Sequence, residues 1–232
     1  MTLEIHALHG IGKVEKGEDV AALLIPPLRQ FEPRAGDVVV VTHKIVSKAE
    51  GAVRAIEGDE EEFKKKLVES EAVSIVRRRG NLIIAETRHG FICANAGIDR
   101  SNAEPGTMIL LPEDPDRSAH RIRIRLEREF ETALAVIISD TFGRPWRRGL
   151  TDVAIGISGM PAILDLKGTT DWAGRELEVT EVAVADEIAG AADLVMGKAS
   201  GIPAALVRGL DLPPGEGRAR DLVRPVDEDL FR

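Results

Sequence analysis

The sequence predicts an α/β protein. Short apolar, β-branched segments alternate along the chain with segments whose apolar residues recur at helical spacing, as in proteins whose strands alternate with helices. Hydrophobic residues make up 44% of the 232 residues and charged residues 30%, which is ordinary for a globular protein with a sizeable core. A chain of this length folds as one large domain or two small ones.

The expected elements follow from the periodicity. Apolar or alternating runs predict strands at residues 3–8, 38–41, 81–86, 107–111, 135–138, 153–157, 162–166 and 204–207. Helical spacing predicts helices at residues 18–29, 57–79, 116–132 and 177–195. We expect Pro26 and Pro27 to stop the first helix and Gly197 to end the last. The charged runs within 57–79 are interpreted as a solvated helix face.

Charge and composition narrow the classes of partner. The net charge of −8 opposes non-specific attraction to nucleic acid or anionic membranes, so an anionic ligand needs a local cationic cluster. No apolar run approaches the roughly 18 residues of a membrane span. The first residues lack the pattern of a secretory signal, and a single cysteine fits a reducing compartment, so we expect a cytoplasmic protein.

The most informative stretch is residues 135–149, AVIISDTFGRPWRRG. An apolar strand is followed by Asp140 and Thr141, whose oxygens suit Mg²⁺ or Mn²⁺, at the strand end where open α/β sheets bind ligands. Arg144 and the nearby Arg147 and Arg148 suit phosphate or carboxylate. The alternative is that Asp140 caps the next segment and the arginines form a solvated face.

Other turns carry weaker signals. The glycines of His9-Gly10-Ile11-Gly12 allow close approach to a ligand, although a plain tight turn is the more frequent reason for such a pair of glycines. If residues 45–49 are helical, Lys44 and Lys48 share a face and either could meet a phosphate; otherwise they are surface lysines. Residues 196–203 form a glycine-bearing turn in which Lys198 is a further candidate, but the sequence contains no Walker A motif.

A third cluster lies in residues 87–102. Asp99 and Asn102 are oxygen donors in a turn flanked by glycine. Cys93 stands between apolar neighbours and is interpreted as a packed thiol. His89 is interpreted as a structural hydrogen-bonding residue, because no second histidine stands at ligand spacing; zinc is therefore not expected.

Several of these motifs, in this order, resemble the coenzyme F420-0:γ-glutamyl ligase family over nearly the whole chain. They are residues 9–12 (HGIG), 47–51 (SKAEG), 93–102 (CANAGIDRSN), 139–149 (SDTFGRPWRRG) and 194–198 (LVMGK). The resemblance implies a mixed α/β fold of two subdomains within one ligase unit spanning residues 1–232, in an intertwined homodimer. It also implies a GTP-dependent enzyme that joins L-glutamate to F420-0 and extends the tail through γ-linked glutamates, with no partner nucleic acid or membrane.

The resemblance also assigns residue roles. Asp99, Asp140 and Thr141 would hold divalent ions, Mg²⁺ or Mn²⁺, with a need for K⁺ left open. Asp140, Lys48 and Arg144 are the expected catalytic residues. GTP would be bound by the following residues: His9, Gly10, Ile11, Gly12, His43, Lys44, Lys48, Asn102, Met196, Gly197, Lys198, Ala199, Ser200, Gly201, Ile202 and Pro203.

Two departures and two alternatives accompany the resemblance. Lys198 stands where an acidic or amide residue is expected beside a second metal, and a protonated lysine cannot be a ligand. Some bacterial relatives carry an added flavin-type reductase domain, which we do not expect in this chain. A metal-dependent phosphohydrolase could use Asp99, Asp140 and the arginines similarly, and a non-catalytic module could bind GTP without turnover.

Overall fold

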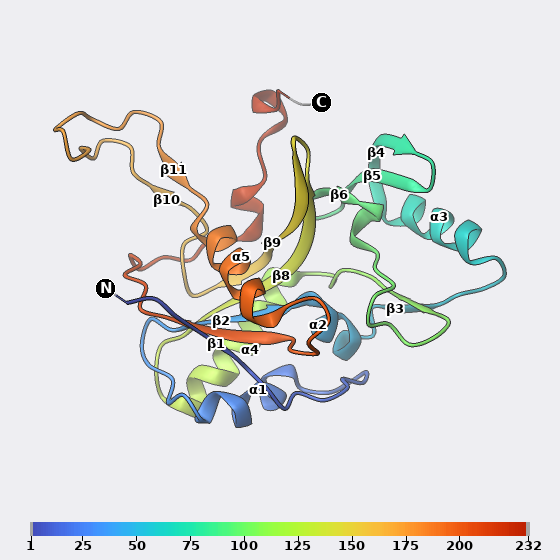
Figure 1. Cartoon of the computed structure of the whole chain (residues 1–232), viewed down its shortest axis with the longest axis horizontal. Coiled ribbons are helices and arrows are strands. Elements are labelled where there is room, and N and C mark those ends of the chain that lie inside the picture. The colour runs from blue at the N-terminus through green and yellow to red at the C-terminus, as the bar shows by residue number, and fades with distance from the viewer. Residues whose placement is uncertain (1, 231–232) are drawn as a thin grey trace.

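A five-stranded sheet forms the centre of the computed structural model, which describes residues 2–230 (Figure 1). Its strands stand in the order β1 (Glu4–Ala7), β12 (Ala204–Arg208), β2 (Val38–Thr42), β8 (Ala135–Arg144) and β9 (Arg147–Ser158). Only β2 and β8 run parallel, and the other neighbours are antiparallel. The expected α/β class is confirmed.

Helices cover both faces of this sheet. On one face, α1 (Val20–Arg29), α2 (His43–Glu50) and α4 (Pro115–Phe130) share a hydrophobic cluster with the sheet. On the other face, α5 (Val184–Met196) packs in a second cluster. Figure 1 shows α1 and α4 on the side of the sheet opposite to α5.

The central strands show why their sequences are apolar without alternation. In β2, Val39 and Val41 belong to the first cluster, whereas Val38 and Val40 belong to the second. Successive side chains of a strand point to opposite faces, so a strand covered on both sides is apolar throughout. The predicted buried strands at 38–41 and 135–138 are therefore confirmed.

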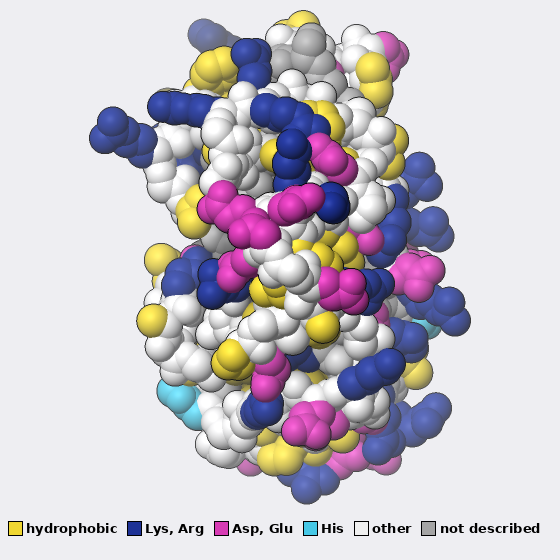
Figure 2. Space-filling model, turned by 90° about the vertical axis from the view of Figure 1, so that its right-hand side faces the viewer, with side chains coloured by type: hydrophobic (Ala, Val, Ile, Leu, Met, Phe, Trp, Pro, Cys, Tyr) yellow, Lys and Arg dark blue, Asp and Glu magenta, His cyan; other side chains and the backbone are white. Residues whose placement is uncertain are grey.

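A third group of elements lies beside the main sheet, to the right in Figure 1, and contains a hydrophobic cluster of its own. Its elements are β3 (Val53–Ala55), α3 (Glu60–Glu71), β4 (Ala72–Arg79), β5 (Leu82–Thr87), β6 (Ile92–Ala94), the short 3₁₀ helix η1 (Asn95–Gly97) and β7 (Thr107–Ile109). Figure 2 shows this side of the molecule, where acidic and basic side chains are mixed on the surface. The division into two subdomains stays a prediction.

The remaining elements are short. They are β10 (Leu164–Asp165), β11 (Glu181–Val182), η2 (Ala219–Leu222) and η3 (Val226–Glu228). β10 and β11 pair with each other away from the main sheet. In residues 2–230 no helix combines the length and the apolarity that a membrane crossing would need.

Three predicted helix boundaries were wrong. Pro26 and Pro27 lie inside α1 instead of stopping it, because packing of that helix on the first cluster outweighs the lost amide donors. The predicted helix 57–79 ends at Glu71, and β-branched residues carry β4 along β5. The predicted helix 177–195 begins only at Val184, since the preceding residues form β11.

The largest correction concerns residues 139–149. The acidic turn predicted after the strand 135–138 lies within β8, which continues to Arg144 and returns as β9 in a long hairpin. The ladder shifts register between Ile138 and Ser139; such a bulge lets a strand continue while re-aiming its side chains. Asp140 and Thr141 are therefore held by strand pairing and not by a loop.

Candidate functional site

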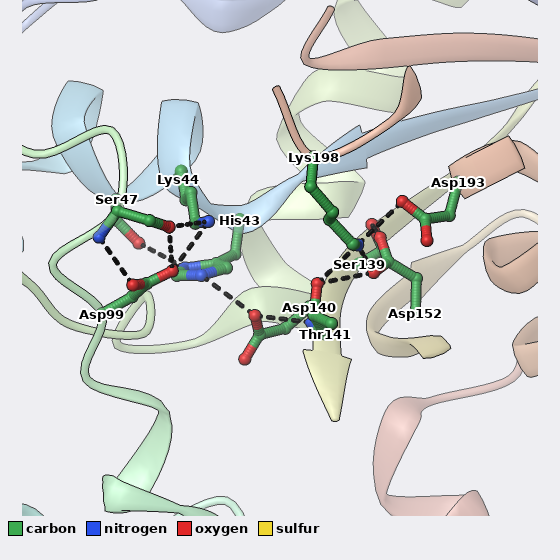
Figure 3. Close-up of polar contacts among 11 residues, drawn as sticks. His43, Lys44, Ser47, Asp99, Ser139, Asp140, Thr141, Asp152, Asp193 and Lys198 are labelled. Carbon is green, nitrogen blue, oxygen red and sulfur yellow. Dashed lines mark hydrogen bonds and ion pairs between the residues drawn. The ribbon is translucent and has the colours of Figure 1, made fainter. Parts of the chain in front are cut away.

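The parallel pair of strands brings two polar segments to one edge of the sheet. Thr42 at the end of β2 stands opposite Ser139 in β8. α2 begins at the next residue, His43, while β8 continues into Asp140 and Thr141. His43 Nε2 consequently lies 3.2 Å from Asp140 Oδ1 (Figure 3). Residues almost a hundred positions apart thus meet because their strands are neighbours.

His43 is a fully buried polar ring. Its side chain has 0% exposure, and Nδ1 lies 3.3 Å from Ser47 Oγ one helical turn later. Nε2 faces Asp140 but has no hydrogen-bond partner, whereas Asp140 Oδ1 accepts a hydrogen bond of 2.7 Å from the Thr141 amide. A buried ring nitrogen left without a hydrogen bond is uncommon, and it marks this corner as a candidate site.

A second carboxylate, Asp99, is held by Lys44 of α2. Lys44 Nζ lies 2.7 Å from Asp99 Oδ2 and donates to Ser101 Oγ at 2.7 Å. The Ser101 amide and hydroxyl also donate to Asp99, at 2.7 and 2.6 Å. Burial by itself would raise the pKa of Asp99, but the hydrogen bonds from Lys44 and Ser101 outweigh it and hold the pKa below its ordinary value.

A third group of contacts surrounds Lys198, which follows α5. Its Nζ donates to Thr141 Oγ1 at 2.7 Å and to Asp152 Oδ1 at 2.5 Å, and it lies 2.7 Å from Asp193 Oδ1. Asp152 in β9 is only 4% exposed and also accepts hydrogen bonds from Ser139 and Thr141. Burial alone would lower the pKa of Lys198, but hydrogen bonds to Asp152 and Asp193 raise it.

A cavity of about 500 Å³ is bordered by Lys44, Thr141, Asp152, Asp193 and Lys198. The predicted metal ligands Asp99 and Asp140 are in contact with these residues or adjacent to them but are not among the residues that line the cavity. Four segments far apart in the sequence contribute most of its wall. The lining residues are Ile11, Gly12, Lys13, Thr42, Lys44, Ile45, Lys48, Asn102, Ala103, Glu104, Thr141, Asp152, Asp193, Met196, Gly197, Lys198, Gly201, Ile202 and Pro203. Four lysines line this cavity of an acidic chain, and they form the local cationic cluster that an anionic ligand requires.

The sequence also matches known proteins. A family model described as "F420-0:Gamma-glutamyl ligase" matches residues 10–209. The chain belongs to this family. The chain is also similar to proteins named "Coenzyme F420:L-glutamate ligase". It is 45% identical to the one from Methanopyrus kandleri, over 100% of this chain and 98% of that protein. It is 44% identical to the one from Methanocaldococcus jannaschii, over 88% of each protein. One from Methanothermobacter thermautotrophicus is 42% identical over 100% of both.

In this F420-0:gamma-glutamyl ligase family member, most of the predicted nucleotide-binding residues line the one cavity. They are Ile11, Gly12, Lys44, Lys48, Asn102, Met196, Gly197, Lys198, Gly201, Ile202 and Pro203. Lys48 Nζ donates to the Asn102 carbonyl at 2.6 Å, and burial lowers the pKa of Lys48. The helical spacing proposed for Lys44 and Lys48 is confirmed, because both belong to α2.

The structure does not bring every predicted residue to the cavity wall. His9, Gly10, Ala199 and Ser200 are neighbours of lining residues without lining it, and His43 is buried against Asp140 instead. Arg144 lies beyond it as well, because β8 carries that residue to the end of the hairpin, where its guanidinium donates to the Arg148 carbonyl at 2.7 Å. The expected catalytic role of Arg144 therefore gains no support from its position.

Two site residues of this ligase family member escaped the sequence reasoning. Asp152 precedes the predicted strand 153–157 and Asp193 lies within the predicted helix 177–195, and no motif marks either residue. Asp152 stands directly opposite Thr141 in the hairpin register, and Asp193 is brought near by packing of α5 on the second face. A hairpin prediction for residues 135–158 would have revealed the first, since facing positions share a side of the ladder.

The predictions for Cys93 and His89 are confirmed. Cys93 is buried, and burial raises the pKa of its thiol to about 12, so it is no nucleophile at neutral pH. His89 Nε2 lies 3.0 Å from the Pro112 carbonyl oxygen and 3.1 Å from that of Glu113. It therefore links the third cluster's strands to the segment before α4.

The two carboxylates predicted to hold a divalent ion differ in their contacts, because both Asp99 oxygens already accept hydrogen bonds from Ser101 and Asp99 Oδ2 also lies 2.7 Å from Lys44 Nζ. Within residues 2–230 no three His, Cys, Asp or Glu side chains gather as a ready-made metal site, so an ion would be shared among two carboxylates, a nucleotide and water, as is common for Mg²⁺. Asp140 uses one oxygen in its contacts with His43 and Thr141, and its other oxygen enters neither contact. The second expected ion, beside Thr141, does not fit in the same way, because Lys198 Nζ is already there.

Proposed function

We propose that the chain is a GTP-dependent coenzyme F420-0:L-glutamate ligase. The observation that carries the proposal is the cavity, in which Lys44, Lys48 and Lys198 stand beside carboxylates from separate elements. This mixture of cations and oxygen donors suits a polyphosphate accompanied by a metal ion. The family description suggests the acceptor, F420-0, and the names of the similar proteins suggest the amine, L-glutamate.

The proposed reaction has two steps. A carboxylate is a poor electrophile, so an oxygen of the acceptor carboxylate first attacks the γ-phosphorus of GTP, the bond to the bridging oxygen of GDP breaks, and an acyl phosphate forms. The amine of glutamate then attacks the acyl carbon. Inorganic phosphate leaves, the nitrogen releases a proton to water, and the amide is complete.

The residues of the cavity position the reactants and stabilise negative charge. Lys48 and Lys44 face the phosphates as point charges, and Asn102 and the turn 196–203 form the wall that receives the nucleotide. Asp99 and Asp140 would hold Mg²⁺ or Mn²⁺, which neutralises charge on the polyphosphate. Lys44 orients Asp99, and the Thr141 amide orients Asp140. Catalysis is positioning and electrostatics, with no protein nucleophile.

A reconstituted reaction tests the proposal. Purified protein is incubated with GTP, Mn²⁺ or Mg²⁺, L-glutamate and F420-0, and product masses are read in the complete mixture and with each component omitted. We expect glutamyl adducts of F420-0 only in the complete mixture, with one GDP formed for each amide bond. Adding and omitting K⁺ in parallel decides whether this ion is needed.

Two other outcomes would point to other functions. Phosphate released from GTP at the same rate without acceptor or glutamate would identify a phosphohydrolase. Binding of GTP without turnover in the complete mixture would identify a non-catalytic nucleotide-binding module. Either result would contradict the ligase proposal.

A further inference from the structure

The ammonium group of Lys198 occupies a site made of three oxygens (Figure 3). Thr141 Oγ1 comes from β8, Asp152 Oδ1 from β9 and Asp193 Oδ1 from α5, and each lies 2.5 to 2.7 Å from Nζ. An ammonium group has three N–H donors. All three are satisfied by this set, so the side chain is fixed although half of it is exposed.

The oxygens around Lys198 are the type that a hard divalent ion takes. Two carboxylates and a hydroxyl would suit Mg²⁺ or Mn²⁺. Here the Thr141 hydroxyl donates its hydrogen to Asp152 and accepts from Lys198, so its bonding is largely used. An ion bound by the same oxygens would stand in contact with the ammonium group, where two positive charges repel strongly.

The charges of these three side chains also weigh against a divalent ion beside Lys198. Asp152 and Asp193 contribute two negative charges, and Lys198 contributes one positive charge. With the lysine present, the cluster carries one net negative charge and faces the cavity through Lys198. Without the lysine charge, the same oxygens would carry two net negative charges beside an unfilled space.

We infer that Lys198 is a tethered cation that takes the place of a second divalent ion at this site. The inference rests on the proposed function, because it concerns how the polyphosphate site is neutralised. One divalent ion then binds per chain, at Asp99 and Asp140, where it displaces Lys44 from the single carboxylate that this lysine contacts. The fixed ammonium of Lys198, held by two carboxylates, supplies the second positive charge on the cavity wall. Lys198 is a positioning residue that sets the metal stoichiometry.

Counting bound Mn²⁺ tests this inference without reference to turnover. The metal-free full-length protein is titrated with Mn²⁺, free Mn²⁺ is measured by electron paramagnetic resonance, and the bound ions are located by anomalous diffraction from crystals grown with Mn²⁺. We expect one ion per chain in the wild type, at Asp99 and Asp140. We expect Lys198→Gln to bind a second ion at Thr141, Asp152 and Asp193, at least about tenfold more tightly than any second ion in the wild type.

Two controls separate the role of Lys198 from a loss of any lysine. Lys167 also contacts two carboxylates, Asp165 and Glu181, but on the surface outside the cavity, and Lys167→Gln should leave the Mn²⁺ count unchanged. In the double variant Lys198→Gln/Asp193→Asn, the gained ion should be lost or bound at least about tenfold more weakly than in Lys198→Gln, because one of its carboxylates is removed.

Either of two results would overturn the inference. Two ions per chain in the wild type, one of them at Thr141, would show that Lys198 moves aside for a metal. One ion per chain in both the wild type and a folded Lys198→Gln variant would show that the lysine merely stabilises the contact between hairpin and helix. Failure of the ligase assay is a separate result, since Mn²⁺ is counted with no substrate present.

Discussion

Asp140 joins the two halves of the candidate site. One of its oxygens lies 3.2 Å from His43 Nε2 and accepts from the Thr141 amide, while the neighbouring Thr141 contacts Lys198. A charged oxygen donor at this point therefore influences both the proposed metal position and the tethered cation.

Replacing Asp140 should abolish ligation without unfolding the protein. We expect Asp140→Ala and the closer mimic Asp140→Asn each to lower kcat by at least about 100-fold, since each removes a charge from a preorganised electrostatic site. Ligation is followed by product mass, and the fold by circular dichroism and thermal unfolding. Near-normal turnover in either variant would contradict the role of Asp140.

The sequence predicts which residues belong to the site better than it predicts which of them contact one another. The motif residues Asp140, Thr141, Lys44 and Lys48 could be singled out because strand ends of one α/β sheet edge collect polar groups. Asp152 and Asp193 could not, since their proximity depends on a hairpin register and on how α5 packs. The role of His43 was also missed, because burial of a ring cannot be read from its neighbours in the chain.

Among the elements, the β8–β9 hairpin needs a glycine where it meets α4. A Cβ atom added at Gly156 would lie 2.5 Å from the Pro115 carbonyl oxygen and 2.6 Å from its carbonyl carbon. Backbone cannot yield as a flexible side chain can. This close approach places the start of α4 against β9, where the Ile157 amide donates to Asp116 at 2.8 Å.

The variant Gly156→Ala should therefore lower the free energy of unfolding by about 1–3 kcal/mol, as overpacking of a filled interior does. Gly143→Ala, in the paired strand β8, is the matched control, since a Cβ there meets nothing within 4 Å. Urea unfolding of both variants measures the difference. Equal stability of the two would show that α4 and β9 adjust without cost.

A buried ion pair connects the strands β2 and β12. Asp37, just before β2, is 2% exposed and accepts hydrogen bonds of 2.9 and 2.6 Å from Arg208, the last residue of β12. Asp37 also accepts from the Arg34 amide at 2.8 Å. The hydrogen bond to Asp37 raises the pKa of Arg208 above its ordinary value.

Asp37→Asn should lower the free energy of unfolding by about 2–3 kcal/mol, because Arg208 would keep its charge without a charged partner. This loss is smaller than the cost of breaking a wholly buried ion pair, since Arg208 is partly exposed. Glu69→Gln is the control, since its pair with Arg78 is largely exposed and should change stability by less than about 0.5 kcal/mol. Matching losses in the two variants would contradict the importance of burial.

The elements themselves were predictable where periodicity was clear. The strands 38–41 and 204–207 and the helix 116–132 appear within one or two residues of their predicted bounds. The errors fall where a second signal competes: charge in residues 72–79 concealed the β-branched pattern of β4, and Pro26 and Pro27 were given more weight than the packing of α1. Pairing partners decide such segments, and they lie far away in the sequence.

For the whole molecule, the intertwined homodimer implied by the family resemblance stays a prediction. Large apolar side chains are exposed on β4, as at Val73, and on the β8–β9 hairpin, as at Leu150, and such groups commonly lie in interfaces. Light scattering after size-exclusion chromatography should give twice the chain mass of 25.1 kDa. Stable dimers stay associated at concentrations on the order of 1 to 100 µM. The mass of a single chain throughout that range would contradict the homodimer.

The parallel neighbours β2 and β8 have a consequence for the time course of folding. Their pairing joins Val38 to Ala135, and closing a loop of roughly 100 residues carries an entropic cost on the order of 4 kcal/mol. Helical turns and local hairpins form without meeting that barrier. In stopped-flow refolding, we expect far-ultraviolet dichroism to recover first and Mn²⁺ binding to lag behind it, because Asp140 reaches His43 only when the two strands meet.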